Sequence, residues 1–328
     1  MKKILFAILF VFPGHFSLLT AKAAPIDRHA LITRHDVVLT NFDAQNPLTV
    51  GNGGFAFTVD ATGLQTFFDA FTNTTPLGTL SDWGWHSFPN PNGWSIDTFH
   101  FKEFPDLNGR LVPYADVPHN QMTPEIKWLR DNPHRLDLGQ IGFVFQHADG
   151  SLATTNDLSD VNQKLDLWNG EIISHFVFDG EAVEVETVCA PNSDAIAVCV
   201  KSELLKQNRL AIQIHFPYGT GDTVTADWNH PDAHETILSQ PAANEVEFQR
   251  QLDNDFYFAA AKWSRGGTMT TLAKHQFEIK SAKDSDASEL ICAFAPTNFS
   301  AANLPAFAQT QRASRIHWNH FWHTGGAI

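Results

Sequence analysis

The sequence predicts an all-β fold, a large antiparallel β-sandwich followed by a C-terminal helix. Most of the chain consists of short runs in which apolar and polar residues alternate between Asn, Asp, Gly, Pro or Ser, the pattern of half-buried strands. Long helical patterns do not alternate regularly with these strands, which disfavours a parallel α/β sheet. No repeat of fixed period is visible in the 328 residues, which counts against a propeller or a solenoid.

Residues 1–23 are predicted to be a signal peptide. Lys2 and Lys3 precede the apolar stretch Ile4–Leu19, and Ala21-Lys22-Ala23 supplies a cleavage pattern of small residues. A retained membrane anchor is the alternative, but Pro and Gly interrupt the apolar stretch and no stop-transfer pattern follows. We therefore expect an exported protein, secreted or periplasmic.

The charge of the mature chain bears on its partners. Cleavage removes Lys2, Lys3 and Lys22 and no acidic residue, so the formal net charge moves from -14 to -17. Such an acidic surface argues against nucleic acid and against an anionic membrane as partners. About 300 mature residues suffice to bury one large core or two modest ones.

The clearest strands form a hairpin over Gly170–Val188. Its first arm alternates up to Phe178, Asp179-Gly180 turns the chain, and the second arm presents Glu184 and Glu186 on a solvated face. Further strands are predicted at Val37–Thr40, Phe55–Val59, Gly142–Gln146, Ala195–Val200, Leu210–Phe216, Glu245–Leu252, Phe256–Trp263, His275–Lys280 and Glu289–Phe294. Residues 124–130 and 158–166 are each predicted to form a short turn of helix.

Three cysteines allow at most one internal disulfide. Cys189 and Cys199 flank a turn and could face each other across a hairpin, whereas buried free thiols, with Cys292 a third, are an equally good interpretation. The cysteines have no metal-binding spacing. We expect no metal and no cofactor.

A helix is predicted over Asn303–Trp322. Trp318, Phe321 and Trp322 are spaced i, i+3 and i+4, so they share one helical face. An aromatic face needs a surface that covers it, and these three residues are predicted to form a domain interface. We divide the mature chain into a sandwich domain, residues 24–300, and a linker helix, residues 301–328, and interpret the whole as the front part of a larger protein.

Residues 72–120 form a loop-rich excursion with many aromatic side chains. Within it, Trp83, Trp85 and His86 combine flat rings with polar groups, as in sites that stack on a sugar. The alternative is that these tryptophans only pin the loop to the sandwich. The excursion is a candidate substrate-binding site for a carbohydrate.

The chain has few motifs of catalytic chemistry. It has no phosphate-binding glycine loop, no nucleophile elbow and no dinucleotide fingerprint. His230, His234 and Glu235 resemble a metal cluster but lack the helical zincin spacing, so a polar surface loop is the preferred interpretation. A glycosidase needs a pair of carboxylates, and no motif singles out such a pair. No catalytic residue is predicted.

The segments Val50–Asp60, Thr62–Phe67, Trp83–Pro91 and Trp318–Ile328 together resemble a bacterial group of secreted glycoside hydrolases related to glycoside hydrolase family 65. The resemblance extends over Asp27–Ile328. It implies that this region is an N-terminal β-supersandwich that precedes a linker helix and an (α/α)6 barrel of the six-hairpin type. The catalytic groups of that family belong to the barrel, so none is assigned here.

The resemblance also implies that Gly51-Asn52-Gly53 faces the barrel, and Asn52 becomes a candidate substrate-binding residue. We therefore expect a non-catalytic N-terminal domain of an exported glycoside hydrolase, which packs on its barrel. A free-standing carbohydrate-binding protein that uses the aromatic loop is the alternative. A purely structural sandwich that docks on another subunit is a third hypothesis.

Overall fold

The computed structural model describes residues 26–97, 99–115 and 122–325. The predicted signal peptide lies outside the described residues, as do the last three residues of the segment Trp318–Ile328. The described helices are α1 (Arg28–Thr33), α2 (Pro124–Asp131), α3 (Glu203–Lys206) and α4 (Phe307–Thr324), with 3-10 turns at Phe68–Phe71, Thr155–Asp157 and Ala301–Asn303. None of these helices is long and apolar enough to cross a membrane.

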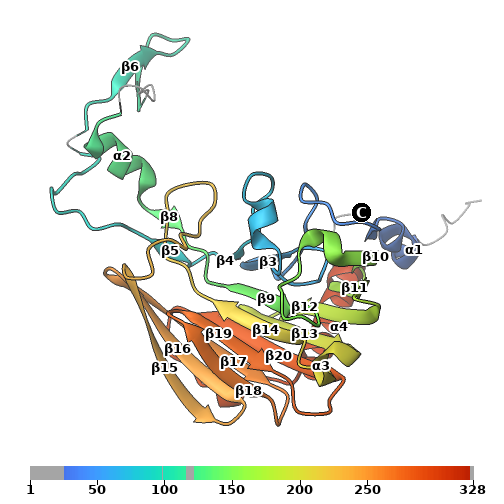
Figure 1. The fold of residues 1–328 in the computed structure, drawn as a ribbon. Coiled ribbons are helices and arrows are strands. Elements are labelled where there is room, and N and C mark those ends of the chain that lie inside the picture. The colour runs from blue at the N-terminus through green and yellow to red at the C-terminus, as the bar shows by residue number, and fades with distance from the viewer. Residues whose placement is uncertain (1–25, 98, 116–121, 326–328) are drawn as a thin grey trace, which may run out of the picture.

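A nine-stranded antiparallel sheet forms most of the fold (Figure 1). Its order is β1 (Val37–Leu39), β10 (Leu158–Asp166), β11 (Glu171–Phe178), β12 (Glu181–Cys189), β13 (Ala195–Lys201), β20 (Ala287–Ala295), β17 (Asp255–Trp263), β16 (Glu245–Leu252) and β15 (His234–Ala242).

A four-stranded sheet lies against it, in the order β18 (Thr268–Ala273), β19 (Gln276–Lys280), β14 (Leu210–His215) and β9 (Gln140–Phe145). A three-stranded sheet of β2 (Leu48–Gly51), β3 (Phe55–Val59) and β4 (Thr79–Ser81) completes the layers. All of the paired strands are antiparallel. The all-β sandwich with a C-terminal helix is confirmed.

The core lies between the sheets and joins side chains that are far apart in sequence. Phe145 of β9 packs on Phe176 of β11, with ring centroids 5.7 Å apart, and Phe216 packs on Phe248 of β16 at 5.1 Å. All four rings are at most 2% exposed. Burial of this kind is the dominant stabilising term in folding.

The hairpin predicted at Gly170–Val188 is confirmed as β11 and β12. Asp179 and Gly180 have φ angles of 49° and 81°, which is the conformation of a two-residue hairpin turn. The predicted solvated face is only partly exposed. The Glu184 side chain is 40% exposed, whereas Glu186 accepts a hydrogen bond from Gln311 of α4 at 2.6 Å.

Two predictions of local structure are wrong. Residues 158–166 form β10 rather than a helix, because Val161 and Gln163 alternate into the core while their neighbours face outward. The polar loop predicted around His230–Glu235 ends early, since β15 begins at His234. In both segments pairing with a neighbouring strand overrode a weak local preference.

The cysteines do not form a disulfide: Cys189, Cys199 and Cys292 are all free. The strand register explains this, because Glu186 lies opposite Cys199 and Ile196 lies opposite Cys189. Burial raises the pKa of the Cys189 thiol to about 12 and that of Cys199 to about 11. These thiols therefore stay protonated and poorly reactive.

Helix α4 packs on the outer face of the large sheet. Phe307, at its first turn, joins a buried cluster with Val188, Ala197 and Ile291. Further along, Arg315 forms a salt bridge with Glu171 at 3.0 Å, and the Glu171 side chain is 3% exposed. At the other end, Arg28 of α1 donates to the Trp322 carbonyl at 2.9 Å. The helix is thus held to the sandwich along its length.

The described residues between 87 and 133 leave the sandwich as a long excursion. It departs from β5 (Trp85–His86), returns through β8 (His134–Arg135), and carries α2 and the hairpin β6 (Lys102–Pro105) with β7 (Leu111–Tyr114). Figure 1 shows this hairpin standing away from the body of the molecule. We call residues 87–133 the arm and the β5–β8 pair its neck.

Candidate functional site

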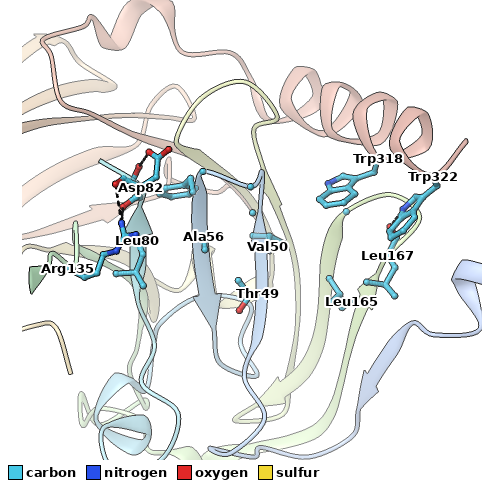
Figure 2. Close-up of a pocket in the computed structure, with 16 residues that line it drawn as sticks. Thr49, Val50, Ala56, Leu80, Asp82, Arg135, Leu165, Leu167, Trp318 and Trp322 are labelled. Atoms are coloured by element: carbon cyan, nitrogen blue, oxygen red, sulfur yellow. Dashed lines mark hydrogen bonds between the residues drawn. The ribbon is translucent and has the colours of Figure 1, made fainter. Parts of the chain in front are cut away.

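A pocket of about 540 Å³ opens between α4 and the three-stranded sheet (Figure 2). Its lining is mostly apolar, with glycine backbone along one side. The residues that line it are Thr49, Val50, Gly51, Gly53, Gly54, Phe55, Ala56, Leu80, Ser81, Asp82, Arg135, Leu165, Leu167, Gly170, Trp318 and Trp322. Five separate segments of the chain meet here, which makes it a product of the tertiary fold.

One wall of the pocket consists of the two tryptophans of α4. The rings of Trp318 and Trp322 stack with centroids 6.0 Å apart and planes inclined by 28°. The Trp322 indole N–H donates to the carbonyl of Leu167 at 2.7 Å. Trp318 lies over Gly170, where a Cβ would come within 1.9 Å of the ring.

The aromatic face of α4 is thus partly covered by residues of this chain. Trp318 and Trp322 rest on the connection between β10 and β11. Phe321 is 41% exposed and meets Trp322 edge to face, with centroids 4.8 Å apart. The Phe321 ring remains exposed on this face, as do the sides of the two indoles that line the pocket.

The opposite wall is the turn between β2 and β3, which Asn52 organises. Its side-chain oxygen accepts the backbone N–H groups of Gly54 and Phe55, at 3.1 and 2.9 Å. Its amide nitrogen donates to the carbonyls of Ala190 and Ser193, at 3.0 and 3.1 Å. The Asn52 amide is therefore engaged within the protein. Its geometry is that of a residue that shapes the pocket wall.

The third side of the pocket carries its charges. Arg135 donates to the carbonyl of Ser81 at 2.6 Å, and its guanidinium lies 4.1 Å from the centre of the Trp85 ring. Of the described residues that line the pocket, Asp82 is the one carboxylate and Arg135 the one cation. Trp85 is 44% exposed, so one face of the ring is covered by Arg135 while part of it meets solvent.

Trp83 points the other way and holds its loop to the sandwich. Its indole N–H donates to Asp194 at 2.6 Å, and its ring lies 6.3 Å from that of Tyr257. The same Asp194 oxygen accepts from the hydroxyl of Ser81. Asp194 was not singled out in the sequence, because nothing local links it to a loop more than a hundred residues away.

His86 is 1% exposed and lies inside the neck of the arm. Its Nδ1 is 3.0 Å from Nε2 of His134, and its Nε2 is 3.1 Å from a carboxylate oxygen of Asp253. The structure therefore does not gather the four predicted residues around one ligand. Trp85 is at the surface, Trp83 and Asn52 are tied to backbone or carboxylate partners, and His86 is interior.

The metal-like histidine cluster does not converge. His230 pairs with Asp227 at 2.6 Å and is largely exposed, whereas His234 is buried beside Arg250. Burial, followed by the charge of Arg250, lowers the pKa of His234 to about 2. Within the described residues no three potential ligands are grouped so as to hold a metal ion.

The lining of the pocket consists mainly of apolar side chains and glycine backbone. Hydrolysis of a glycosidic bond needs two carboxyl groups about 5–10 Å apart, and the pocket brings only Asp82 to its edge. Its size is that of a small-ligand site, yet its stacked indoles and its leucine and valine side chains offer few hydrogen-bonding partners. The sequence did not indicate that Arg135, Leu165 and Leu167 line a pocket, because their positions there depend on how the sheets pack.

Comparisons with known proteins identify the fold. No protein-family model and no curated protein sequence matches the chain. Among solved structures it is similar to "Putative kojibiose phosphorylase from human microbiome", with a TM-score of 0.51 and 8% identity over 88% of this chain. The comparison with a bacterial glucoamylase complexed with acarbose has a TM-score of 0.40, with 10% identity over 58% of this chain and 32% of that chain. The comparison with a family GH92 α-mannosidase from Bacteroides thetaiotaomicron has a TM-score of 0.26, with 7% identity over 56% of this chain and 28% of that chain.

The first of these likenesses shows the fold, and the two with lower TM-scores add no argument. The chain shares its backbone fold with part of that putative phosphorylase. It spans 38% of the length of the phosphorylase that it matches. At 8% identity the likeness concerns the backbone and does not carry over any activity.

Proposed function

We propose that the chain is the non-catalytic N-terminal domain of an exported glycoside hydrolase related to glycoside hydrolase family 65, and that it packs on an (α/α)6 catalytic barrel. The observation that carries this proposal is the backbone likeness over 88% of this chain but 38% of the phosphorylase. The remaining length of such an enzyme holds its other domains. Export rests on the predicted signal peptide.

The open pocket supports a role in domain packing. Trp318, Trp322 and the exposed ring of Phe321 form one continuous aromatic edge beside it. Apolar patches of this kind mark interaction sites, and interfaces between domains of one chain resemble those between proteins. In this proposal Trp318, Phe321 and Trp322 contact the barrel, and Asn52 shapes the wall that faces it.

The proposal is tested by sequencing the DNA that follows the codon for Ile328 and expressing the complete product. We expect an open frame that encodes a helical domain with paired carboxylates, and activity on glucose disaccharides in the complete product alone.

In that product Phe321→Ala should loosen the barrel, measured as a lower unfolding temperature of that domain. Ile316→Ala, also exposed on α4 at 60%, is the matched control. A stop codon after Ile328 would contradict the proposal.

A free-standing carbohydrate-binding protein is the second candidate function. The specific observation in its favour is Trp85, whose ring is backed by the Arg135 guanidinium and is 44% exposed. A rigid, half-exposed aromatic ring presents a flat face for the C–H side of a pyranose. Its indole N–H donates to the Asp82 carbonyl at 2.9 Å, which fixes the orientation of the ring.

If Trp85 is a sugar platform, Trp85→Ala should weaken binding of kojibiose or maltose by about 1–3 kcal/mol, by analogy with stacking of a base on an aromatic ring. Isothermal titration calorimetry of the whole chain measures this. Phe104→Ala, which removes a ring of the same exposed fraction (44%) on the β6–β7 hairpin, is the control and should leave the affinity unchanged. Equal affinity of the wild type and the Trp85 variant would end the hypothesis.

A further inference from the structure

The arm contains many apolar side chains, yet not one of its described residues is buried. On α2, Ile126, Trp128 and Leu129 are only partly covered, and Trp94 lies beside Trp128 with ring centroids 6.3 Å apart. Ordering the backbone costs about 1–2 kcal/mol per residue, and burial of apolar surface is the main term that offsets this cost. An arm without a core of its own therefore needs a surface that covers it.

The hairpin of β6 and β7, at the far end of the arm, exposes large apolar side chains (Figure 1). Phe104 is 44% and Tyr114 is 54% exposed, and their rings meet edge to face with centroids 5.8 Å apart. Leu111 is 56% exposed, and Leu107 in the turn is fully exposed. A two-stranded hairpin is at best marginally stable in water unless further strands or another surface cover its apolar side.

One side of this hairpin is a groove. Lys102 pairs with Tyr114 and Phe104 pairs with Val112, and Asp106 continues the alternation at the tip, where its N–H donates to the carbonyl of Arg110. Paired and alternate residues point to one side of a ladder. We call Lys102, Phe104, Asp106, Val112 and Tyr114 the groove face. A hollow of about 480 Å³ is lined by four of them, Phe104, Asp106, Val112 and Tyr114, together with Pro105 and Ala115.

The edges of the hairpin are protected against the addition of a strand. Pro105 lies in β6 and Pro113 lies in β7, and neither has a backbone N–H to donate to an added strand. Proline on an edge strand is one means by which proteins prevent pairing with another chain. A partner of the hairpin is therefore recognised by the side chains of a face, and the groove face is the hollow one.

We propose that two copies of this chain pack their groove faces together about a two-fold axis, so that each hairpin covers the other. The groove face is complementary to itself, because Lys102 lies at its base, apolar side chains lie in its middle and Asp106 lies at its tip. With the two hairpins antiparallel, Val112 meets its own counterpart and Lys102 lies opposite the partner's Asp106. An interface about a two-fold axis uses the same patch on both chains in this way.

The distribution of charge favours a second copy at this place. The arm has four cations and six acidic residues, a formal charge of -2, so the rest of the mature chain carries -15 of its -17. Two copies therefore repel each other over the body of the molecule and least at the arm. Asp106 is paired with Arg110 at 3.3 Å, yet its side chain is 29% exposed and so accessible to a second cation.

The size of the groove face sets the expected affinity. A face of five side chains is smaller than the roughly 800 Å² that each partner buries in a standard interface. We therefore expect a dimer with a dissociation constant on the order of micromolar. This dimer is separate from the proposed packing of α4 on a barrel, since the two use different surfaces.

Sedimentation velocity of the mature chain across micromolar concentrations tests the proposal. Tyr114→Asp should raise the dissociation constant at least about tenfold, because it places an unpaired charge against the apolar middle of the partner's face. Phe256→Asp is the matched control, since that ring is 58% exposed and lies on β17 of the large sheet. A monomer at every concentration, or a dimer that Phe256→Asp weakens as much as Tyr114→Asp, would overturn the proposal.

Cysteine cross-linking tests the two-fold packing itself. The thiol of Val112→Cys lies beside the axis, so a mild oxidant should join it to the same thiol of the second copy and give a covalent dimer. Leu152→Cys, an exposed position (64%) in the bridge to Gln146 on the sandwich, is the control and should stay monomeric on a non-reducing gel. If Val112→Cys gave no more covalent dimer than this control, the groove face would not be the interface.

Discussion

Replacing Gly170 with alanine should detach the C-terminal half of α4 from the sandwich. Gly170 has a φ angle of 67°, and an added Cβ would lie 1.9 Å from Cδ1 and 2.7 Å from Cγ of Trp318. Rotation of the indole about its Cβ–Cγ bond leaves Cγ in place, so that rotation does not relieve the clash. We expect a loss of about 3 kcal/mol, of which about 1–2 kcal/mol is the left-handed conformation. Urea unfolding measures the loss, and tryptophan fluorescence reports the changed environment of Trp318.

Gly180→Ala is the matched control for this prediction. Gly180 also has a positive φ, 81°, but an added Cβ there meets no atom within 4 Å. It should therefore lose only the conformational contribution of about 1 kcal/mol. If both variants lost the same stability, the packing of Trp318 on Gly170 would contribute nothing, and α4 would be held by its other contacts alone.

Arg250→Met should produce the largest loss of stability of any single change considered for this chain. Arg250 is 0% exposed and donates to the carbonyls of Glu235 and Pro217 at 2.7 and 3.0 Å. It also donates to the Thr236 hydroxyl and to His234 Nδ1. Methionine fills the space but makes none of these four hydrogen bonds, while the Thr236 hydroxyl keeps its contact with His275 Nδ1. We expect a loss of about 3–5 kcal/mol, since each buried acceptor that is left unpaired costs about 1–3 kcal/mol.

Thermal and urea unfolding of the purified variant test this prediction. Arg110→Met is the control, because that side chain is 79% exposed and forms a surface ion pair with Asp106, and surface ion pairs contribute about 0–1 kcal/mol. Arg250→Lys should recover part of the loss at most, since a lysine has one nitrogen for four acceptors. An Arg250→Met protein as stable as the wild type would show that burial of the guanidinium costs as much as its hydrogen bonds return.

Most strands could be predicted because their pattern is local. Phe55–Val59 and Glu245–Leu252 were predicted with the bounds observed for β3 and β16, since alternation of period two depends only on neighbours in sequence. Residues 158–166 were mistaken for a helix because their polar face masks the alternation. The core partners of these strands come from distant segments, so no local pattern names them.

The candidate site could be predicted only in part, for a related reason. Trp83, Trp85 and His86 are neighbours in sequence, yet Trp83 lies in a turn, whereas Trp85 and His86 are successive residues of β5 and point to opposite sides. Trp83 reaches Asp194, Trp85 stays at the surface and His86 enters the neck. Adjacency in sequence suggested one platform where the structure has three separate environments.

The sequence by itself determined the all-β class, the main hairpin, the C-terminal helix and the shared aromatic face of Trp318, Phe321 and Trp322, because each follows from periodicity. Only the tertiary structure decided where that face lies, which residues enclose the pocket, and that Arg250 and the His86–His134 pair are buried with their partners. These features join segments separated by tens to hundreds of residues. Their hydrogen bonds and apolar contacts exist only when the sheets pack, and packing is a property of the whole chain.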